Sequence, residues 1–329
     1  MLSLRVKKLF SGLMGKYSMF FVLVFMVILS TFLNSNFMSA GNLLNVSRQL
    51  AVGTILAYGA TLLIIGGMLD LSSGSVLALA GVLSVSFYKA TGSLLGSFFV
   101  GISVGVACNL VNAFVVTQFS VPPFIATLSM QTVARGIALL YTKGQNILQL
   151  GDFVIFGQGN IYGIPTPIIF LIVITVVVWY ILRHTRFGRS LYAIGGNQEA
   201  AIAAGINVNR EKYKAYIVNG ILVGIAGVLF MSRVNAGLPN GAIGFEMEGL
   251  TAAIVGGTSF SGGVGTAGGT LIGSFIIRCL NNIINLTGVD SYVQQITKGA
   301  IIALAVIYDI KSKNKKTRKV ILLPKSETK

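Results

Sequence analysis

Long apolar runs alternate with short polar segments along most of the chain. FFVLVFMVILSTFL fills residues 20–33, and PIIFLIVITVVVWYIL fills residues 167–182. Runs of this length suit the ~20 residues that a helix needs to cross the hydrocarbon core of a bilayer. The pattern therefore predicts an all-α integral membrane protein, in which several helices cross the membrane and pack as a bundle.

The runs predict about ten spans in one membrane domain. The run at 248–257 is too short to cross the bilayer alone, so we expect a broken or re-entrant segment there. No linker-like stretch divides the chain, which predicts a single transmembrane domain over residues 1–310 and a basic, disordered tail over residues 311–329. The predicted spans lie near residues 18–33, 49–67, 73–88, 94–117, 124–141, 167–183, 213–232, 248–257, 268–286 and 292–309.

Charge predicts the orientation of these spans. Only 10% of the 329 residues are charged, yet the net charge is +16. Of the 25 Lys and Arg residues, 18 lie before Tyr17, from Arg183 to Lys214, or after Asp309. Cytoplasmic loops carry the excess of Lys and Arg in membrane proteins, so we expect both termini and the loop 184–213 in the cytoplasm. Even numbers of predicted spans separate the three basic segments, as this orientation requires. The charge then belongs to the membrane surface, and no nucleic-acid partner is expected.

Glycines lie inside several of the runs. Gly220 and Gly224 form a GxxxG pattern within one predicted span, which favours the close approach of another helix. Segments 64–81 and 254–273 share an apolar run, a Gly-Gly pair and small polar residues, and by the span count both breaks have the same orientation. Transporters often interrupt helices where a solute binds. In a chain with 40 glycines the similarity could equally be a coincidence.

No motif predicts catalysis. The patterns GxxxxGK[ST], HExxH and GxSxG are absent, so we expect neither an enzyme nor a nucleotide bound by this chain. The single histidine, His184, lies beside Arg183, which argues against a metal site, and no cofactor is expected. Cys108 and Cys279 lie in apolar runs without paired spacing and are interpreted as small buried hydrophobes.

Polar residues within the spans are candidates for a solute path. Asp70 lies within the break GGMLDLSSGS and could either cap the next helix or line the path. Span amides could hydrogen-bond a hydroxyl-rich neutral solute, or they could join helices. Other charged residues lie close to span ends, where long side chains can reach the surface: Arg135, Glu246, Glu248, Arg278, Asp290 and Lys298. The candidate path residues are Asp70, Ser72, Ser75, Asn112, Gln131, Asn281, Asn282 and Asn285.

The segment GGNQEAAIAAGINV, residues 195–208, predicts a short cytoplasmic helix. Asn197 suits the N-cap, Glu199 suits the first turn, and Gly205 suits the left-handed stop position. The helix between them, Gln198–Ala204, would be about 10 Å long. A helix this short is not stable alone in water. It must pack either on its own membrane domain or on a partner protein.

Several motifs together resemble the ribose permease subfamily of sugar permeases from bacterial ATP-binding-cassette importers. The loop RFGRSLYAIGGNQEAAIAAGINVNREK is similar to the coupling loop of that family, and the similarity runs from about residue 37 to residue 309. DLSSGS (70–75), PPFIATLSM (122–130) and GFEMEGLTAAIVGGTSFSGGVGTAGGTLIG (244–273) add to it. The chain departs from the family at Glu248, where many relatives have Asp, and in its longer basic tail.

The resemblance implies a set of partners. Family members are dimers of membrane subunits, so a second permease, either a copy or a sister chain, is expected. A cytoplasmic ATPase would bind ATP and Mg, and an extracytoplasmic binding protein would deliver the sugar. The short helix would be the coupling helix, and its ATPase-coupling residues would be Asn197, Glu199, Ala200, Ala201, Ala204 and Gly205.

The resemblance also implies a location and a solute class. The chain would be a multi-pass protein of the bacterial cytoplasmic membrane and would form the path for a neutral monosaccharide, ribose or a similar sugar. Autoinducer-2, galactose, inositol or a nucleoside are alternative solutes. A secondary carrier driven by an ion gradient is a competing hypothesis, but the acidic or histidine relays that it predicts are scarce here.

Overall fold

The structure, a computed structural model, describes residues 19–288 and ten separate residues between 290 and 307. The predictions for the segment before Tyr17, for most of span 292–309, for Lys298 and for the tail 311–329 concern residues outside the described ones. The described residues therefore cover the first nine predicted spans.

Helices make up most of the described chain, which confirms an all-α polytopic membrane protein. Seven are long and apolar enough to cross a bilayer: α2 (Ala40–Ile65), α3 (Ser73–Thr91), α4 (Leu94–Gln118), α5 (Pro123–Thr142), α7 (Thr166–His184), α10 (Val208–Val234) and α12 (Ala267–Leu286). A shorter apolar helix covers Met19–Leu33. The remaining helices are η1 (Ser35–Met38), η2 (Gly151–Val154), α6 (Ile155–Gln158), α8 (Arg186–Gly196), α9 (Gln198–Ala203) and α11 (Phe245–Val255).

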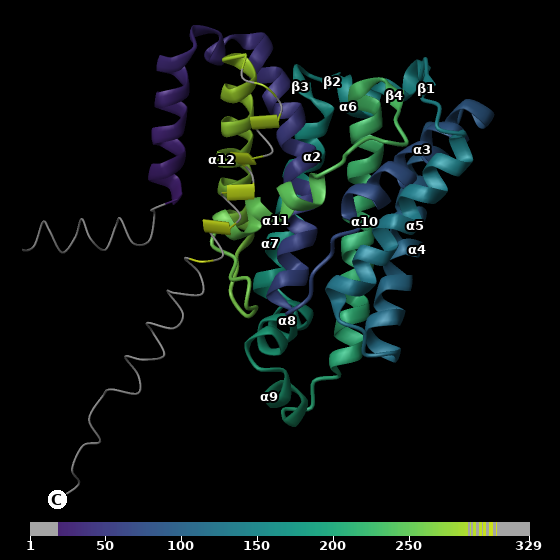
Figure 1. Ribbon diagram of the computed structural model, residues 1–329, viewed down its shortest axis with the longest axis vertical. Coiled ribbons are helices and arrows are strands. Elements are labelled where there is room, and N and C mark those ends of the chain that lie inside the picture. The colour runs from purple at the N-terminus through teal and green to yellow at the C-terminus, as the bar shows by residue number, and fades with distance from the viewer. Residues whose placement is uncertain are drawn as a thin grey trace, which may run out of the picture.

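The four short strands gather at one end of the molecule. Strand β1 (Ile147–Leu148) pairs with β4 (Ala236–Gly237), and β2 (Asn160–Ile161) pairs with β3 (Ile164–Pro165), both antiparallel. Figure 1 shows these strands and α6 at the end opposite to α8 and α9. The membrane domain therefore has two distinct ends, and the basic loop with α8 and α9 forms one of them.

Two helices extend beyond the apolar runs that predicted them. The run at 49–67 marks only part of α2, which begins at Ala40, and the run at 213–232 marks only part of α10, which begins at Val208. Both starts are polar, and each is fixed by a cap. The side chain of Ser39 accepts a bond from Asn42 N, and that of Asn207 accepts one from Arg210 N. An apolar run therefore predicts the part of a helix that lies in the membrane but not the polar turns that extend it.

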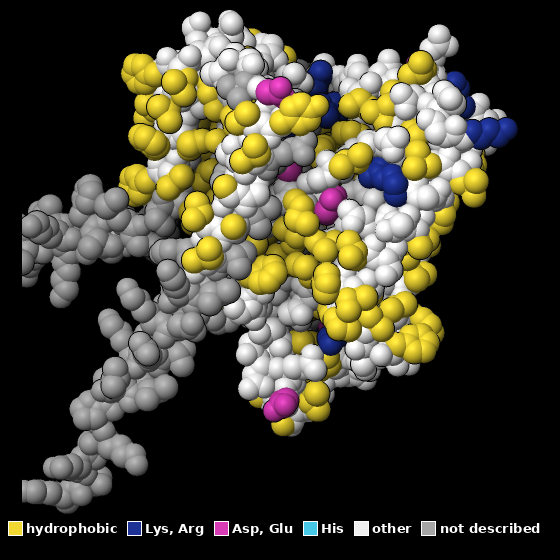
Figure 2. All heavy atoms as spheres, in the orientation of Figure 1, with side chains coloured by type: hydrophobic (Ala, Val, Ile, Leu, Met, Phe, Trp, Pro, Cys, Tyr) yellow, Lys and Arg dark blue, Asp and Glu magenta, His cyan; other side chains and the backbone are white. Residues whose placement is uncertain are grey.

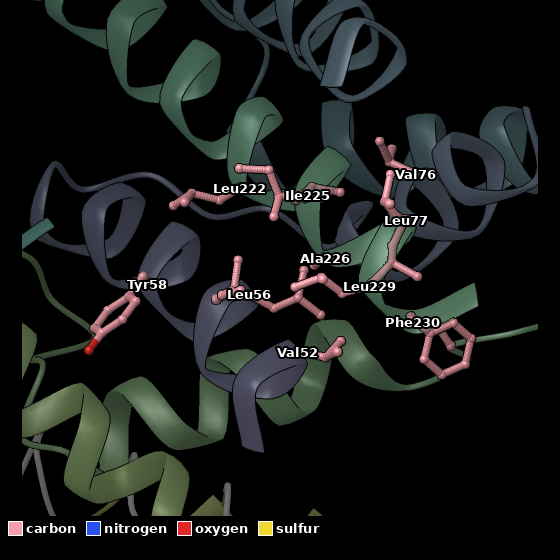
Figure 3. Packing of buried hydrophobic residues seen from close by; sticks show 14 of the residues in the cluster. Val52, Leu56, Tyr58, Val76, Leu77, Leu222, Ile225, Ala226, Leu229 and Phe230 are labelled. Carbon is pink, nitrogen blue, oxygen red and sulfur yellow. The ribbon is translucent and has the colours of Figure 1, made fainter. Parts of the chain in front are cut away.

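Helices α2 and α10 form the centre of the bundle. Within an apolar stretch of 18 residues in each helix, 83% of the stretch is buried in α10 but only 28% in α5. Figure 3 shows Val52 and Leu56 of α2, Leu77 of α3 and Leu229 of α10 packed in one cluster, and all four are buried. Much of the surface is apolar (Figure 2), as lipid contact requires.

Glycines bring α4 and α10 into backbone contact. A Cβ built on Gly105 would lie 2.2 Å from Gly220 O, and one built on Gly224 would lie 2.5 Å from Gly101 O. Only glycine fits at such distances, so the GxxxG pattern of Gly220 and Gly224 serves close helix packing, as the sequence predicted.

Two spans are broken by non-helical segments. Residues 66–72 precede α3, and residues 238–244 precede the 11-residue α11, which Figure 1 shows at mid-height in the bundle. The prediction that 248–257 is too short to cross alone is therefore confirmed.

The similarity between segments 64–81 and 254–273 has a local structural basis. Helices α2 and α11 end alike, because Gly67 N bonds Ile64 O and Gly257 N bonds Ile254 O, with both glycines at positive φ. The loop between α11 and α12 also meets the end of α2, since Gly263 N donates to Ile65 O over 2.9 Å. Both Gly-Gly pairs therefore lie at the same end of the bundle, as the span count predicted.

Candidate functional site

Asp70 lies at the broken start of α3, where it accepts four hydrogen bonds. Its Oδ1 accepts from Ser72 N (2.7 Å) and Ser72 Oγ (2.5 Å), and its Oδ2 accepts from Ser73 Oγ (2.8 Å) and Asn219 Nδ2 (2.6 Å). Asp70 is buried. A carboxylate at a helix N-terminus is favoured by the helix dipole and by the free N–H groups there. Asp70 therefore satisfies backbone and side-chain donors at the break, which is one of the two roles that the sequence left open.

The bonds of Asp70 continue into a buried network that joins α3, α4 and α10. Asn219 Nδ2 also donates to Asn109 Oδ1 (2.9 Å), and Asn112 Nδ2 donates to Ser72 Oγ (3.1 Å). All of these side chains are buried. Of the candidate path residues, Asp70, Ser72 and Asn112 thus lie together. The sequence interpretation missed Asn219, although an amide inside a predicted span was the signal that could have found it.

An open groove adjoins this network between α3, α5 and α11. Its cavity of about 430 Å³ is lined by Ser75, Gln131, Arg135 and Glu246, among others. Gln131 Nε2 donates to Glu246 Oε1 over 3.1 Å. Arg135 Nη1 donates to the carbonyls of Pro239 and Gly241, in the segment that leads into α11. Figure 2 shows acidic and basic side chains together in the middle of the face that carries α11, α10 and α3.

The groove contains two predicted path residues and two that the sequence interpretation set aside. Ser75 and Gln131 were candidates. Arg135 and Glu246 were assigned to span ends, where side chains reach the surface, but Glu246 is buried and Arg135 partly buried. Proximity to a span end was misleading at Glu246 because α11 begins inside the bundle rather than at the membrane surface.

The three amides of α12 lie apart from the groove and the Asp70 network. Asn281 Nδ2 donates to Glu248 Oε1 of α11 over 3.2 Å. Asn282 and Asn42 of α2 exchange bonds of 2.8 and 2.9 Å. Asn285 lies one turn of α12 further on. The bonds of Asn281 and Asn282 therefore tie α12 to its neighbours, the second use of a span amide that the sequence allowed.

The basic loop folds as the sequence predicted, with one residue fewer in its short helix. Asn197 Oδ1 accepts a bond from Ala200 N over 2.9 Å, so Asn197 is the N-cap of α9. Gly205 has φ +81°, and Ile206 N donates to Ala201 O. This C-terminal motif ends α9 at Ala203 instead of Ala204.

Helix α9 has an inner and an outer face. Ala201 is 3% exposed and packs with Ile194 and Val208. Ile202 is 55% exposed. The other exposed residues of this turn are Gln198, Glu199, Ala200, Ala203, Ala204 and Gly205. The helix therefore packs on its own domain through Ala201 and leaves a small-residue face open.

Helix α8 contacts the end of α2 and the loop between α11 and α12. Tyr192 Oη donates to Gly265 O over 2.7 Å. A Cβ on Gly195 would lie 1.8 Å from Ile65 O and 2.6 Å from Gly263 N, so the backbones are in contact. A displacement of α8 would therefore press directly on the end of α2 and on the loop between α11 and α12.

Comparison with known proteins identifies the family. Residues 42–306 match the family model described as the permease component of the branched-chain amino acid transport system. The chain is 40% identical over 305 residues to the ribose import permease of Bacillus subtilis (strain 168), covering 92% of this chain and 95% of that protein. It is 39% identical to the ribose import permease of Escherichia coli (strain K12), with 91% and 94% covered.

More distant relatives carry other sugar names. The D-allose transport system permease of Escherichia coli (strain K12) is 33% identical, with 89% of this chain and 91% of that protein covered. No solved structure matches the chain. The family match and the identity to the ribose permeases extend over the long helices, both breaks and the basic loop. The chain therefore belongs to this permease family, whose members are the membrane subunits of ATP-binding-cassette importers.

Proposed function

We propose that this chain is the permease subunit of an importer for a neutral monosaccharide, with ribose as the expected solute. The observation that carries the proposal is 40% identity to a ribose import permease along nearly the whole of both chains. An extracytoplasmic binding protein delivers the sugar, and a cytoplasmic ATPase drives its passage. ATP and Mg belong to that ATPase, because this chain lacks a P-loop.

The groove between α3, α5 and α11 supports a sugar path. Gln131, Arg135, Glu246 and Ser75 offer amide, charged and hydroxyl groups, and sugar hydroxyls can donate to or accept from each of them. Charged residues within spanning elements normally face a bundle interior or a water-filled cavity rather than lipid. We infer that a second permease subunit closes the open side of the groove, so that the path lies between the two.

The outer face of α9 supports an ATPase contact. Glu199, Ala200, Ala204 and Gly205 are exposed on it, and small side chains allow a partner to approach closely. Ala201 contributes indirectly, because it seats α9 against Ile194 and Val208. Through Tyr192 and Gly195 of α8, movement of the ATPase would reach the end of α2 and the loop between α11 and α12.

We further infer ten spans in the cytoplasmic membrane of a bacterium, with both termini in the cytoplasm. The seven long helices, the helix Met19–Leu33 and the broken segment at α11 account for nine of these spans. The C-terminal apolar run at 292–309 supplies the tenth. The positive charge of loop 184–213 supports its cytoplasmic side.

ATP-dependent uptake tests the proposal. The chain would be co-purified with its partner ATPase, reconstituted in liposomes, and supplied with the matching binding protein and labelled ribose. We expect uptake that requires ATP hydrolysis and persists with ionophores that collapse proton and sodium gradients. Competition by D-allose and L-arabinose would rank the solutes. Uptake that needs a gradient and ignores ATP would contradict the proposal and favour the secondary carrier.

Blocking the groove tests its place on the path. Thr132 lines the groove, whereas Ile137 is exposed on α5 outside it. We expect Thr132→Trp to abolish uptake and Ile137→Trp to leave it near the wild-type rate, with both variants assembling normally. Equal uptake by the two variants would remove the groove from the path.

A further inference from the structure

An ion pair joins α11 to α12 inside the membrane domain. Arg278 Nη2 and Glu248 Oε2 are 3.1 Å apart, and both residues are buried. Asn281 also donates to Glu248, and Arg278 Nη1 donates to Gln49 Oε1 of α2 over 3.3 Å. The sequence placed both charges near span ends, where side chains reach the surface. The structure instead pairs them in the interior.

A small cavity adjoins this ion pair, where α2, α11 and α12 meet. Its volume, taken as the room open to the centre of a water molecule, is about 10 Å³. A buried water needs room for one water-sized sphere and two to four polar partners. Thr54, Ser274, Glu248 and Arg278 all line the cavity. It therefore has the size and the polar lining that one water requires.

Two buried hydroxyl groups indicate that a ligand binds in this cavity. Thr54 Oγ1 and Ser274 Oγ are fully buried and bond no group in the described part of the chain, and the two residues are 0% and 5% exposed. Other helical hydroxyls, such as those of Thr61 and Thr175, bond the carbonyl four residues earlier. Leaving a buried hydroxyl unpaired costs folding free energy. A ligand that bonds both hydroxyls removes that cost twice.

We infer that a single water molecule binds here and bridges Thr54 of α2 and Ser274 of α12 beside the Glu248–Arg278 pair. Water fits the volume, and it can donate to one hydroxyl while accepting from the other. The site is independent of which solute the protein carries.

The water would complete the anchor of a helix that is too short to hold its own place in a bilayer. A buried ion pair offsets its desolvation only when further hydrogen bonds satisfy its groups. Asn281 of α12 and Gln49 of α2 supply such bonds, and the water joins these two helices beside the pair. Helix α11 carries Glu246 of the groove two residues before Glu248, so this anchor also fixes one wall of the groove.

Direct observation is the first test. A structure of the assembled importer in lipid nanodiscs, at a resolution where internal waters are visible, should show a density peak within hydrogen-bonding distance of both hydroxyl oxygens. A cavity without density, in a map that resolves other internal waters, would overturn the proposal.

A double-mutant cycle is the second test. We expect Thr54→Val and Ser274→Ala each to lower the unfolding temperature of the purified importer. When both hydroxyls bond one water, the second substitution should lower it by less than half as much as it does alone. Thr54→Val combined with Ser129→Ala is the matched control and should be additive, because Ser129 Oγ bonds Ile125 O on exposed α5. Additive losses for Thr54→Val and Ser274→Ala would rule out a shared water.

Discussion

Asp70 concentrates four accepted hydrogen bonds on one buried carboxylate. Replacing it with Ala would leave the Ser72, Ser73 and Asn219 donors without that acceptor, at about 1–3 kcal/mol for each group that stays unpaired. We expect Asp70→Ala to lower the unfolding temperature markedly and to reduce uptake with it. Asp70→Asn should have a smaller effect, because its amide keeps one acceptor oxygen. Asp152→Ala, at an exposed acid in η2, is the control.

The outcome separates two roles for Asp70. If Asp70 contacted only the solute, Asp70→Ala would lose uptake at a wild-type unfolding temperature. A loss of both would support its position in the network. Unchanged stability and uptake would mean that the bonds at the break are dispensable.

Single residues also mark the limit of what the sequence reveals. Asp70 stood out because a charge inside an apolar pattern is rare, and its local bonds to Ser72 and Ser73 follow from spacing. Its partner Asn219 lies 149 positions away, and nothing local links the two. Likewise Ala200 is exposed and Ala201 buried, a distinction that two identical side chains cannot signal.

At the scale of elements, the contact between α4 and α10 depends on glycine. A methyl group on Gly105 would lie 2.2 Å from Gly220 O, backbone that cannot move aside locally. We expect Gly105→Ala to destabilise the protein by about 1–3 kcal/mol, the usual range for overpacking. Gly41→Ala is the matched control, because no atom lies within 4 Å of its Cβ position in α2. It should be neutral or stabilise by up to ~1 kcal/mol.

Thermal unfolding in nanodiscs would measure both glycine variants. Equal unfolding temperatures would show that α4 and α10 separate easily and that the GxxxG contact contributes little. The pattern in the sequence was sufficient to predict a close contact here, but not which helix supplies the facing glycines.

Helix α9 allows a comparison of two similar substitutions on opposite faces. Ala204 is exposed, whereas Ala201 packs on Ile194 and Val208. We expect Ala204→Trp to leave stability unchanged and to weaken ATPase binding, about tenfold for each 1.4 kcal/mol of misfit. Ala201→Trp should instead lower stability, because the inner face has no room. Co-purification with the ATPase and unfolding temperature would be measured for both.

The comparison decides what α9 does. Normal ATPase binding by the Ala204→Trp variant, together with normal uptake, would assign α9 to its own domain alone. The sequence left that alternative open because it showed a helix too short to stand alone but not how many of its faces were covered.

For the whole molecule, the fold was predictable where lipid imposes a pattern and less so where the chain departs from it. Apolar runs located α4, α5, α7 and α12 to within a residue or two. The break around Asp70 was predicted, but the runs could not show that residues 238–244 run non-helically into the bundle, because such residues suit both a surface loop and a buried break. The groove depends on those breaks, which is why Glu246 was not a candidate.

Membrane orientation is a property of the whole molecule, and cysteine labelling can test it. If loop 184–213 is cytoplasmic, then α9 and the β2–β3 hairpin lie on opposite sides, because Figure 1 places them at opposite ends. Asn160 of β2 and Gln198 of α9 are both exposed, so a cysteine at either position can react. The variants would be made after replacing Cys108 and Cys279 with Ala. An impermeant maleimide added to intact cells should label Asn160→Cys and spare Gln198→Cys, and both should react once the membrane is permeabilised. If only Gln198→Cys were labelled in intact cells, the orientation would be the opposite of the predicted one. The proposed ATPase contact would then lie on the wrong side of the membrane.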